Sequence, residues 1–152
     1  MFLLINNYDN ENLILSEKQK NNILPGSDFY RLYYSDEDLT LNGIFIKFNI
    51  KNINIQKYFN KVKCCFDEEI NKNEISSLIT LEKKVLKKFK DYIKKEPDFI
   101  IKEQLKQCFI KIFTEKQIKF GKYNNINLLI KISGIWVQQQ KYGLTFRFLI
   151  AN

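Results

Sequence analysis

Residues 126–150 read INLLIKISGIWVQQQKYGLTFRFLI, two apolar runs separated by a short polar stretch. In both runs large apolar side chains alternate with other residues, which is typical of strands with one buried face. We therefore predict a β-hairpin with strands Ile126–Val137 and Tyr142–Ile150. Gly134 falls in the apolar row of the first strand, where a residue without a side chain predicts a bulge or a sharp bend. Trp136 lies in the same row, and we expect it to be a core residue.

Other strands are predicted by the same alternation and by aromatic and β-branched composition. They cover Phe29–Tyr34, Ile44–Ile50, Tyr58–Phe66 and Leu105–Phe113. In Ile44–Ile50 every second residue is apolar and predicts a buried face, whereas the opposite face carries Phe45, Lys47 and Asn49. A ring beside an ammonium group is an unusual choice for a face that contacts water alone.

One helix is predicted over Ser77–Lys95. Apolar residues recur there at steps of three and four, and Pro97 ends the pattern because it lacks an amide donor. Seven lysines coat the other side of this segment. We interpret them as a solvated face in preference to a phosphate-binding one.

The order of these elements predicts a mainly β fold with one long helix. It matches an OB-like five-stranded barrel, in which the helix lies between the third and fourth strands. The length of 152 residues favours a single domain over 1–152. Residues 1–28 are expected to be a partly irregular N-terminal segment, and 29–152 the nucleic-acid-binding body.

Charge is distributed unevenly along the chain. The formal net charge is +8, but residues 1–40 carry −4 and residues 41–152 carry +12. A basic body of this kind predicts a polyanionic partner. A second interpretation stays open, because the abundance of Asn, Ile and Lys is also typical of translation from an AT-rich genome.

Residues that carry common catalytic chemistry are sparse. The chain has no histidine, and its three cysteines, Cys64, Cys65 and Cys108, predict neither a disulfide framework nor a zinc site. Gly-rich phosphate loops and serine elbows are also missing from the sequence. We therefore expect no enzyme activity, no metal and no cofactor. The apolar run Phe2–Ile5 is too short for a signal peptide or a membrane span, so we expect no membrane partner and a reducing, cytoplasmic location.

Aromatic and cationic side chains alternate on the expected outer faces of several strands. Proteins that bind single strands need cations to follow the phosphates and rings on which bases stack. Each ring taken alone is more often a core residue, so the prediction depends on the whole set. The candidate nucleic-acid-binding residues are Tyr30, Arg31, Tyr33, Tyr34, Phe45, Lys47, Tyr58, Lys61, Lys63, Lys111, Lys131 and Arg147.

The C-terminal hairpin also carries a resemblance. The stretch LIKISGIWV at 129–137, followed by YGLTFRF at 142–148, resembles a segment of the single-stranded-DNA-binding proteins of large cytoplasmic DNA viruses and of yeast linear killer plasmids. It covers some twenty residues of the chain. The resemblance implies functional positions at Lys131, Ser133, Gly134, Trp136, Gly143, Thr145 and Arg147. The acidic residues that follow the Trp in those proteins are replaced here by Val137, Gln138 and Gln139, and the sequence ends without an acidic tail.

Taken together, these features predict a protein that binds single-stranded DNA of any base sequence (sequence-tolerant binding) and acts in DNA replication. Its partners would be single-stranded DNA and replication proteins, and the oligomeric state, including a homo-oligomer, stays open. Two alternatives remain. One is an RNA-binding or duplex-DNA-binding accessory factor, since lysines and rings do not select the sugar. The other is a protein-interaction or virion structural module whose charge reflects codon usage.

Overall fold

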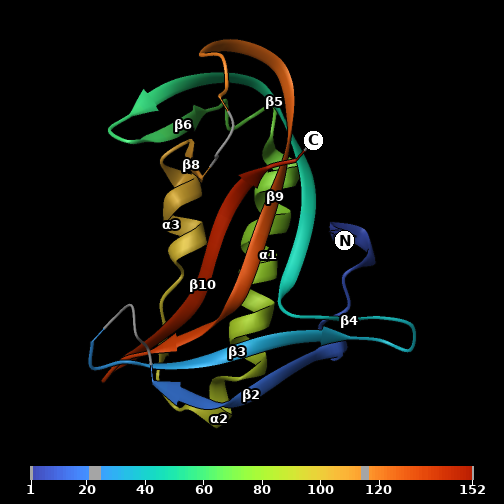
Figure 1. Ribbon diagram of the computed structural model, residues 1–152, viewed down its shortest axis with the longest axis vertical. Coiled ribbons are helices and arrows are strands. Elements are labelled where there is room, and N and C mark those ends of the chain that lie inside the picture. Colours follow the sequence, from blue (N-terminus) through green and yellow to red (C-terminus); the bar gives the residue numbers. More distant parts are fainter. Residues whose placement is uncertain (1, 21–24, 114–116, 152) are drawn as a thin grey trace.

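The computed structural model describes residues 2–20, 25–113 and 117–151 (Figure 1). The strands are β1 (Leu3–Leu4), β2 (Leu13–Lys20), β3 (Asp28–Ser35), β4 (Thr40–Leu41), β5 (Ile44–Tyr58), β6 (Lys61–Cys65), β7 (Glu96–Pro97), β8 (Phe109–Phe113), β9 (Gly121–Val137) and β10 (Lys141–Ile150). The helices are α1 (Lys72–Lys88), α2 (Lys90–Ile93) and α3 (Ile100–Lys106). Two short 3₁₀ turns, Ile5–Asn7 and Asn10–Asn12, precede β2.

Five of the strands close into a barrel. The hydrogen-bonded order is β5-β6-β8-β10-β9, and β9 pairs again with β5. All of these pairs are antiparallel except β8 with β10. The prediction of a mainly β fold is confirmed, and the closed five-stranded barrel is consistent with an OB-like architecture. Strand β3 pairs with β9 beyond the ring and carries β2 and β4 along its own edges.

Strand β5 pairs with β9 on one edge and with β6 near its end. Its alternation of buried and outward side chains shifts by one residue at Asn52. Before this residue the even-numbered apolar side chains, such as Ile50, are buried, and after it Ile53 and Ile55 are buried. Asn52 has φ 52°, a left-handed conformation that Asn adopts more readily than most residues. The buried side chain of Asn71 holds the bend, since its amide group bonds both the N–H and the C=O of Lys51.

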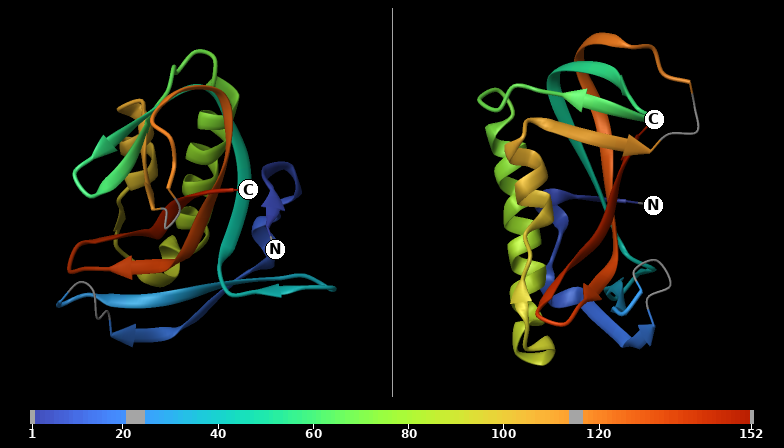
Figure 2. Two further views of the ribbon diagram at one scale, coloured as in Figure 1. Left: turned by 45° about the horizontal axis from the view of Figure 1, so that its top comes forward. Right: turned by 90° about the vertical axis from the view of Figure 1, so that its left-hand side faces the viewer.

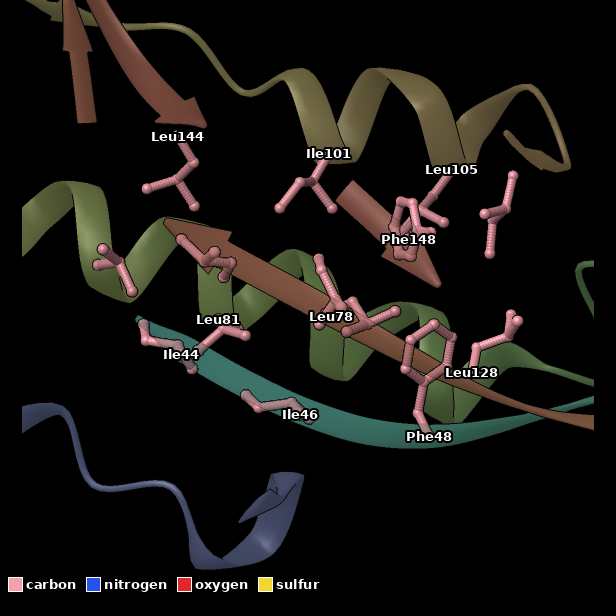
Figure 3. Packing of buried hydrophobic residues seen from close by; sticks show 14 of the residues in the cluster. Ile44, Ile46, Phe48, Leu78, Leu81, Ile101, Leu105, Leu128, Leu144 and Phe148 are labelled. Atoms are coloured by element: carbon pink, nitrogen blue, oxygen red, sulfur yellow. The ribbon is translucent and has the colours of Figure 1, made fainter. Parts of the chain in front are cut away.

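The helices pack against one side of the barrel, and of the residues that the structure describes, strands and loops make up the other side (Figure 2). Leu78 and Leu81 of α1 and Ile101 of α3 point into the apolar interior. There they meet the inward side chains of the strands, including Phe48 and Phe148, whose rings lie 6.0 Å apart (Figure 3). Full burial of each such side chain stabilises the fold by about 1.5–3 kcal/mol. The hydroxyl of Tyr142 donates a 2.6 Å hydrogen bond to the Leu86 carbonyl, which ties β10 to α1.

The helical region differs from the predicted single helix Ser77–Lys95. It begins earlier, at Lys72, and breaks at Phe89 before the short α2. The helices also connect β6 to β8, the second and third strands of the barrel, and not the third to the fourth. The strand counted first in the prediction, β3, lies outside the ring, which accounts for the difference. One long helix between the third and fourth strands is therefore not confirmed.

The predicted C-terminal hairpin is present, with β9 starting five residues earlier than expected. The register of β9 and β10 shifts between Thr145 and Phe146, beside Gly134, so the predicted irregularity is confirmed. Trp136 is buried, but the register shift moves it off the predicted inward row, and its neighbours Ile135 and Val137 join the core cluster in its place. Two predicted strands have the wrong bounds. Leu105 and Lys106 end α3 in place of starting a strand, and Phe59 and Asn60 separate β5 from β6 within the predicted strand Tyr58–Phe66. The N-terminal segment contributes β1 and β2 to the sheet, beside two 3₁₀ turns.

Candidate nucleic-acid interface

The outer face of β6 and β8 gathers rings and lysines. Val62, Cys64, Ile110 and Ile112 point toward the interior, so Lys63, Lys111 and Phe109 point outward, because successive side chains of a strand alternate. Tyr58, at the end of β5, joins them from the neighbouring strand. We call Tyr58, Phe59, Lys63, Phe109 and Lys111 the ring–lysine cluster.

The ammonium groups of this cluster lie over the rings. Nζ of Lys63 is 4.4 Å from the centroid of the Phe109 ring and 5.4 Å from that of Tyr58. Nζ of Lys111 is 5.2 Å from the Tyr58 centroid. Such contacts contribute about 0.5–1 kcal/mol each at exposed sites. They hold two ammonium groups next to rings that remain partly exposed, which is the arrangement that phosphates and bases of one strand would use together.

Phe59 sits at the tip of the two-residue connection between β5 and β6. Its side chain is 81% exposed, and its ring meets Tyr58 edge-on at 4.9 Å between centroids. Its φ of 53° is left-handed, which is unfavourable for a bulky aromatic residue. An exposed ring and a left-handed backbone both lower the stability of the fold. Residues strained in this way are common at binding sites.

Cations form a row around the barrel. Lys63 pairs directly with Lys111 across β6 and β8, and Arg147 pairs with Lys131 across β10 and β9. Since Ile112 pairs with Phe148 in the parallel β8–β10 pair, the residues before them, Lys111 and Arg147, also lie side by side. We call Lys63, Lys111, Arg147 and Lys131 the cation row. The row places four cationic side chains on the outer side of four adjacent strands.

The row ends at another ring. Lys131 pairs with Phe45 of β5, and its Nζ lies 5.6 Å from the Phe45 ring centroid. Lys47 follows Phe45 by two residues on β5, and its Nζ lies 5.1 Å from the centroid of the Phe2 ring. Phe45 and Lys47 are half-buried and face outward, because their strand neighbours Ile44, Ile46 and Phe48 point inward.

The candidates on β3 fall on two different faces. Arg31 and Tyr33 point to the outer side, and the Arg31 guanidinium donates a 3.1 Å hydrogen bond to Asn42. Tyr30 faces the helices, where it meets Tyr92 of α2 edge-on, and burial raises the pKa of its hydroxyl. Tyr34 is 1% exposed, and its hydroxyl oxygen accepts the Asp9 N–H at 3.0 Å. The expectation that Tyr30 and Tyr34 share an exposed face with Arg31 was wrong, because neighbours on a strand point in opposite directions.

The sequence prediction named Tyr58, Lys61, Lys63, Lys111, Lys131 and Arg147, and the structure brings these residues to the outside of the barrel. Lys61 is exposed and pairs with Tyr58 at the start of β6. Phe59 and Phe109 are missing from that prediction. Phe109 has the same strand parity as Lys111, and this signal would have been enough to find it. Nothing in the sequence shows that Phe59 forms a turn and is left exposed.

Two lysines of the segment predicted as a helix have structural contacts, Lys88 at the end of α1 and Lys95 just after α2. Lys88 donates a 2.6 Å hydrogen bond to the Asn10 carbonyl, and Lys95 donates one of 2.7 Å to the Gln139 carbonyl. Both contacts tie the helices to other segments of the chain. These two ammonium groups therefore have a role within the fold, whereas the interpretation of the other lysines as a solvated face stays a prediction.

No protein-family model, curated protein or solved structure matches the chain. Within the ranges that the structure describes, none of the helices has both the length and the apolar character needed to cross a membrane. The fold and the site therefore define the class without a relative: a closed, OB-like β-barrel with an outer face of rings and cations.

Proposed function

We propose that this protein binds single-stranded nucleic acid without sequence preference, and that its biological ligand is single-stranded DNA exposed during replication. The observation that carries the proposal is the ring–lysine cluster. Its two ammonium groups lie 4.4–5.4 Å from the rings of Tyr58 and Phe109, on the outer face of β6 and β8. Bases stacked on these rings would contribute about 1–3 kcal/mol each.

The location of the cluster within the barrel supports the same function. In OB folds the second and third strands, with the loop between the first and second, bind oligonucleotides. Here the corresponding parts are β6, β8 and the connection at Phe59. The resemblance of the C-terminal hairpin to viral and plasmid single-stranded-DNA-binding proteins points to the same ligand. Binding would sequester and protect the exposed strand, with no bond made or broken.

The direct test is a fluorescence-anisotropy titration with labelled oligo-dT at two salt concentrations. We expect tight binding that weakens steeply with salt, because each neutralised phosphate releases counterions. A duplex of the same length should bind more weakly, since its bases cannot reach the rings. An oligo-U competitor tests whether the protein distinguishes RNA from DNA by the 2′-OH.

Variants locate the site. Phe59→Ala and Phe109→Ala should each weaken oligo-dT binding by about 1–3 kcal/mol. Tyr92→Ala is the matched control, because Tyr92 is also an exposed ring, 66% accessible, but lies on α2 on the helical side. Equal losses in all three variants, or no binding of oligo-dT at low salt, would contradict the proposal and favour a protein-interaction module.

A further inference from the structure

The cation row extends beyond the ring–lysine cluster, across two more strands, to a second ring. It starts at Lys63 and Lys111 inside the cluster, continues with Arg147 on β10 and Lys131 on β9, and ends at Phe45 on β5. Each step joins outward residues of adjacent strands. The row therefore runs across the strands and around the barrel.

We propose that a bound single strand follows this row, with its phosphates on the four cations and its bases stacked at both ends. One stacking position is the ring–lysine cluster, and the other is Phe45. This inference rests on the proposed function and deepens it, because it assigns the path and the length of the bound segment.

Electrostatics favours this path over one along β6 and β8. A strand that ran parallel to β6 would reach Lys63 and Lys111 but not Arg147 and Lys131, which pair with each other on β10 and β9. A strand that crosses β10 and β9 brings negative charge to all four cations. A base would then stack on Phe45, as another would on Tyr58. Nζ of Lys131 lies 5.6 Å from the centroid of the Phe45 ring, so a phosphate next to that base would meet a cation.

The geometry sets the length of the bound segment. Neighbouring strands lie about 4.8 Å apart, so the steps from Lys63 to Phe45 span roughly 19 Å. A strand with stacked bases advances about 3.4 Å per nucleotide, which gives roughly six nucleotides on the path. This falls within the range of about 4–16 nucleotides that single OB folds occupy.

The test compares the salt dependence of three double variants with that of the wild type. The distal variant is Lys131→Ala with Arg147→Ala, and the proximal variant is Lys63→Ala with Lys111→Ala. The charge-matched control is Lys83→Ala with Lys87→Ala, which removes two exposed lysines of α1 from the helical side. The affinity of each is measured for oligo-dT of about twelve nucleotides over a range of salt concentrations, and thermal unfolding shows that each is folded. Lys131→Gln with Arg147→Gln, which keeps most of each side-chain stem, replaces the distal variant if the alanine form unfolds.

On the proposed path, the distal and proximal variants each lower the slope of log K against log salt by about 1.4, since each cation removed accounts for about 0.7. The control leaves the slope unchanged. In a length series, the wild-type affinity should rise up to roughly six nucleotides, whereas that of the distal variant should level off earlier.

Two results would overturn the path. One is a distal variant with the wild-type slope while the proximal variant loses its share, and the other is a control that loses as much as the distal variant. In both cases the wild type still binds, so the proposed function stands. Failure of the wild type to bind any oligonucleotide at low salt overturns the function itself.

Discussion

Glu82 shows how a single residue joins two helices. Its side chain is fully buried on α1, and its two carboxylate oxygens accept the N–H groups of Ile101 and Lys102, at 2.8 and 3.0 Å, in the first turn of α3. Burial raises the pKa of Glu82 to about 7, with a further increase from Asp98, while the two N–H bonds and Lys102 lower it in part. The carboxyl group therefore holds a proton in the folded chain at pH values where it is ionised in the unfolded chain.

This pKa gives a prediction for stability. Because the folded value lies above the ordinary value of 4.5, the stabilising contribution is complete below about pH 4.5 and is lost as pH rises to about 7. Relative to Glu82→Gln, which does not titrate, the wild type should lose about 1–3 kcal/mol of unfolding free energy between pH 4.5 and pH 8. Urea unfolding of both proteins at the two pH values measures the difference. A difference that stays constant with pH would show that folding does not shift the pKa of Glu82.

The C-terminal hairpin depends on a residue without a side chain at position 134. A Cβ added to Gly134 would lie 2.3 Å from the Tyr30 carbonyl oxygen and 2.5 Å from the Phe29 ring, so β3 passes too close to allow any other residue. We expect Gly134→Ala to destabilise the protein by about 1–3 kcal/mol, because β3 must shift away from β9. Ser133→Ala, at the neighbouring position of the same strand, is the control and should cost much less. The midpoints of urea unfolding of the two variants compare them, and equal midpoints would mean that β3 moves freely.

Strand β5 shows which features of an element can be predicted from sequence. The alternation in Ile44–Ile50 predicts the buried face correctly, because a strand with one buried face repeats every two residues. The pattern changes phase at Lys51 and Asn52, so the predicted strand ended at Ile50, residues 51–57 were assigned to no element, and Tyr58 was placed in the next strand. A left-handed Asn restores the pairing with β9 after the change, and this depends on tertiary contacts such as that of Asn71 with Lys51. The outward position of Tyr58 follows from that bend.

At the scale of the whole molecule, closure of the barrel decides which candidate residues lie on its outer face and which are buried. Charge and ring composition predict a face with cations, and the barrel brings cations from β6, β8, β10 and β9 into one row. Composition does not show which rings face inward. Tyr34 and Phe45 are equal candidates in the sequence, yet Tyr34 lies under the N-terminal segment and Phe45 lies beside Lys131. Long-range pairing between β5 and β9 makes this difference, and no local pattern encodes it.

The same pair of residues gives a prediction in which stability and binding respond separately. Tyr34→Phe removes the hydroxyl that accepts hydrogen bonds from the Asp9 N–H and from Asn12, at 3.0 and 3.4 Å, so stability should fall by about 1–2 kcal/mol with affinity for oligo-dT unchanged. Phe45→Ala removes a half-buried outer ring, so affinity should fall roughly tenfold, while the chain stays folded. Urea unfolding and anisotropy on the same preparations measure both quantities. If Phe45→Ala unfolds the protein, the ring is part of the core and cannot serve as a stacking position. If Tyr34→Phe weakens binding as much as Phe45→Ala does, the ligand reaches the N-terminal side, and the outer barrel face is not the main contact.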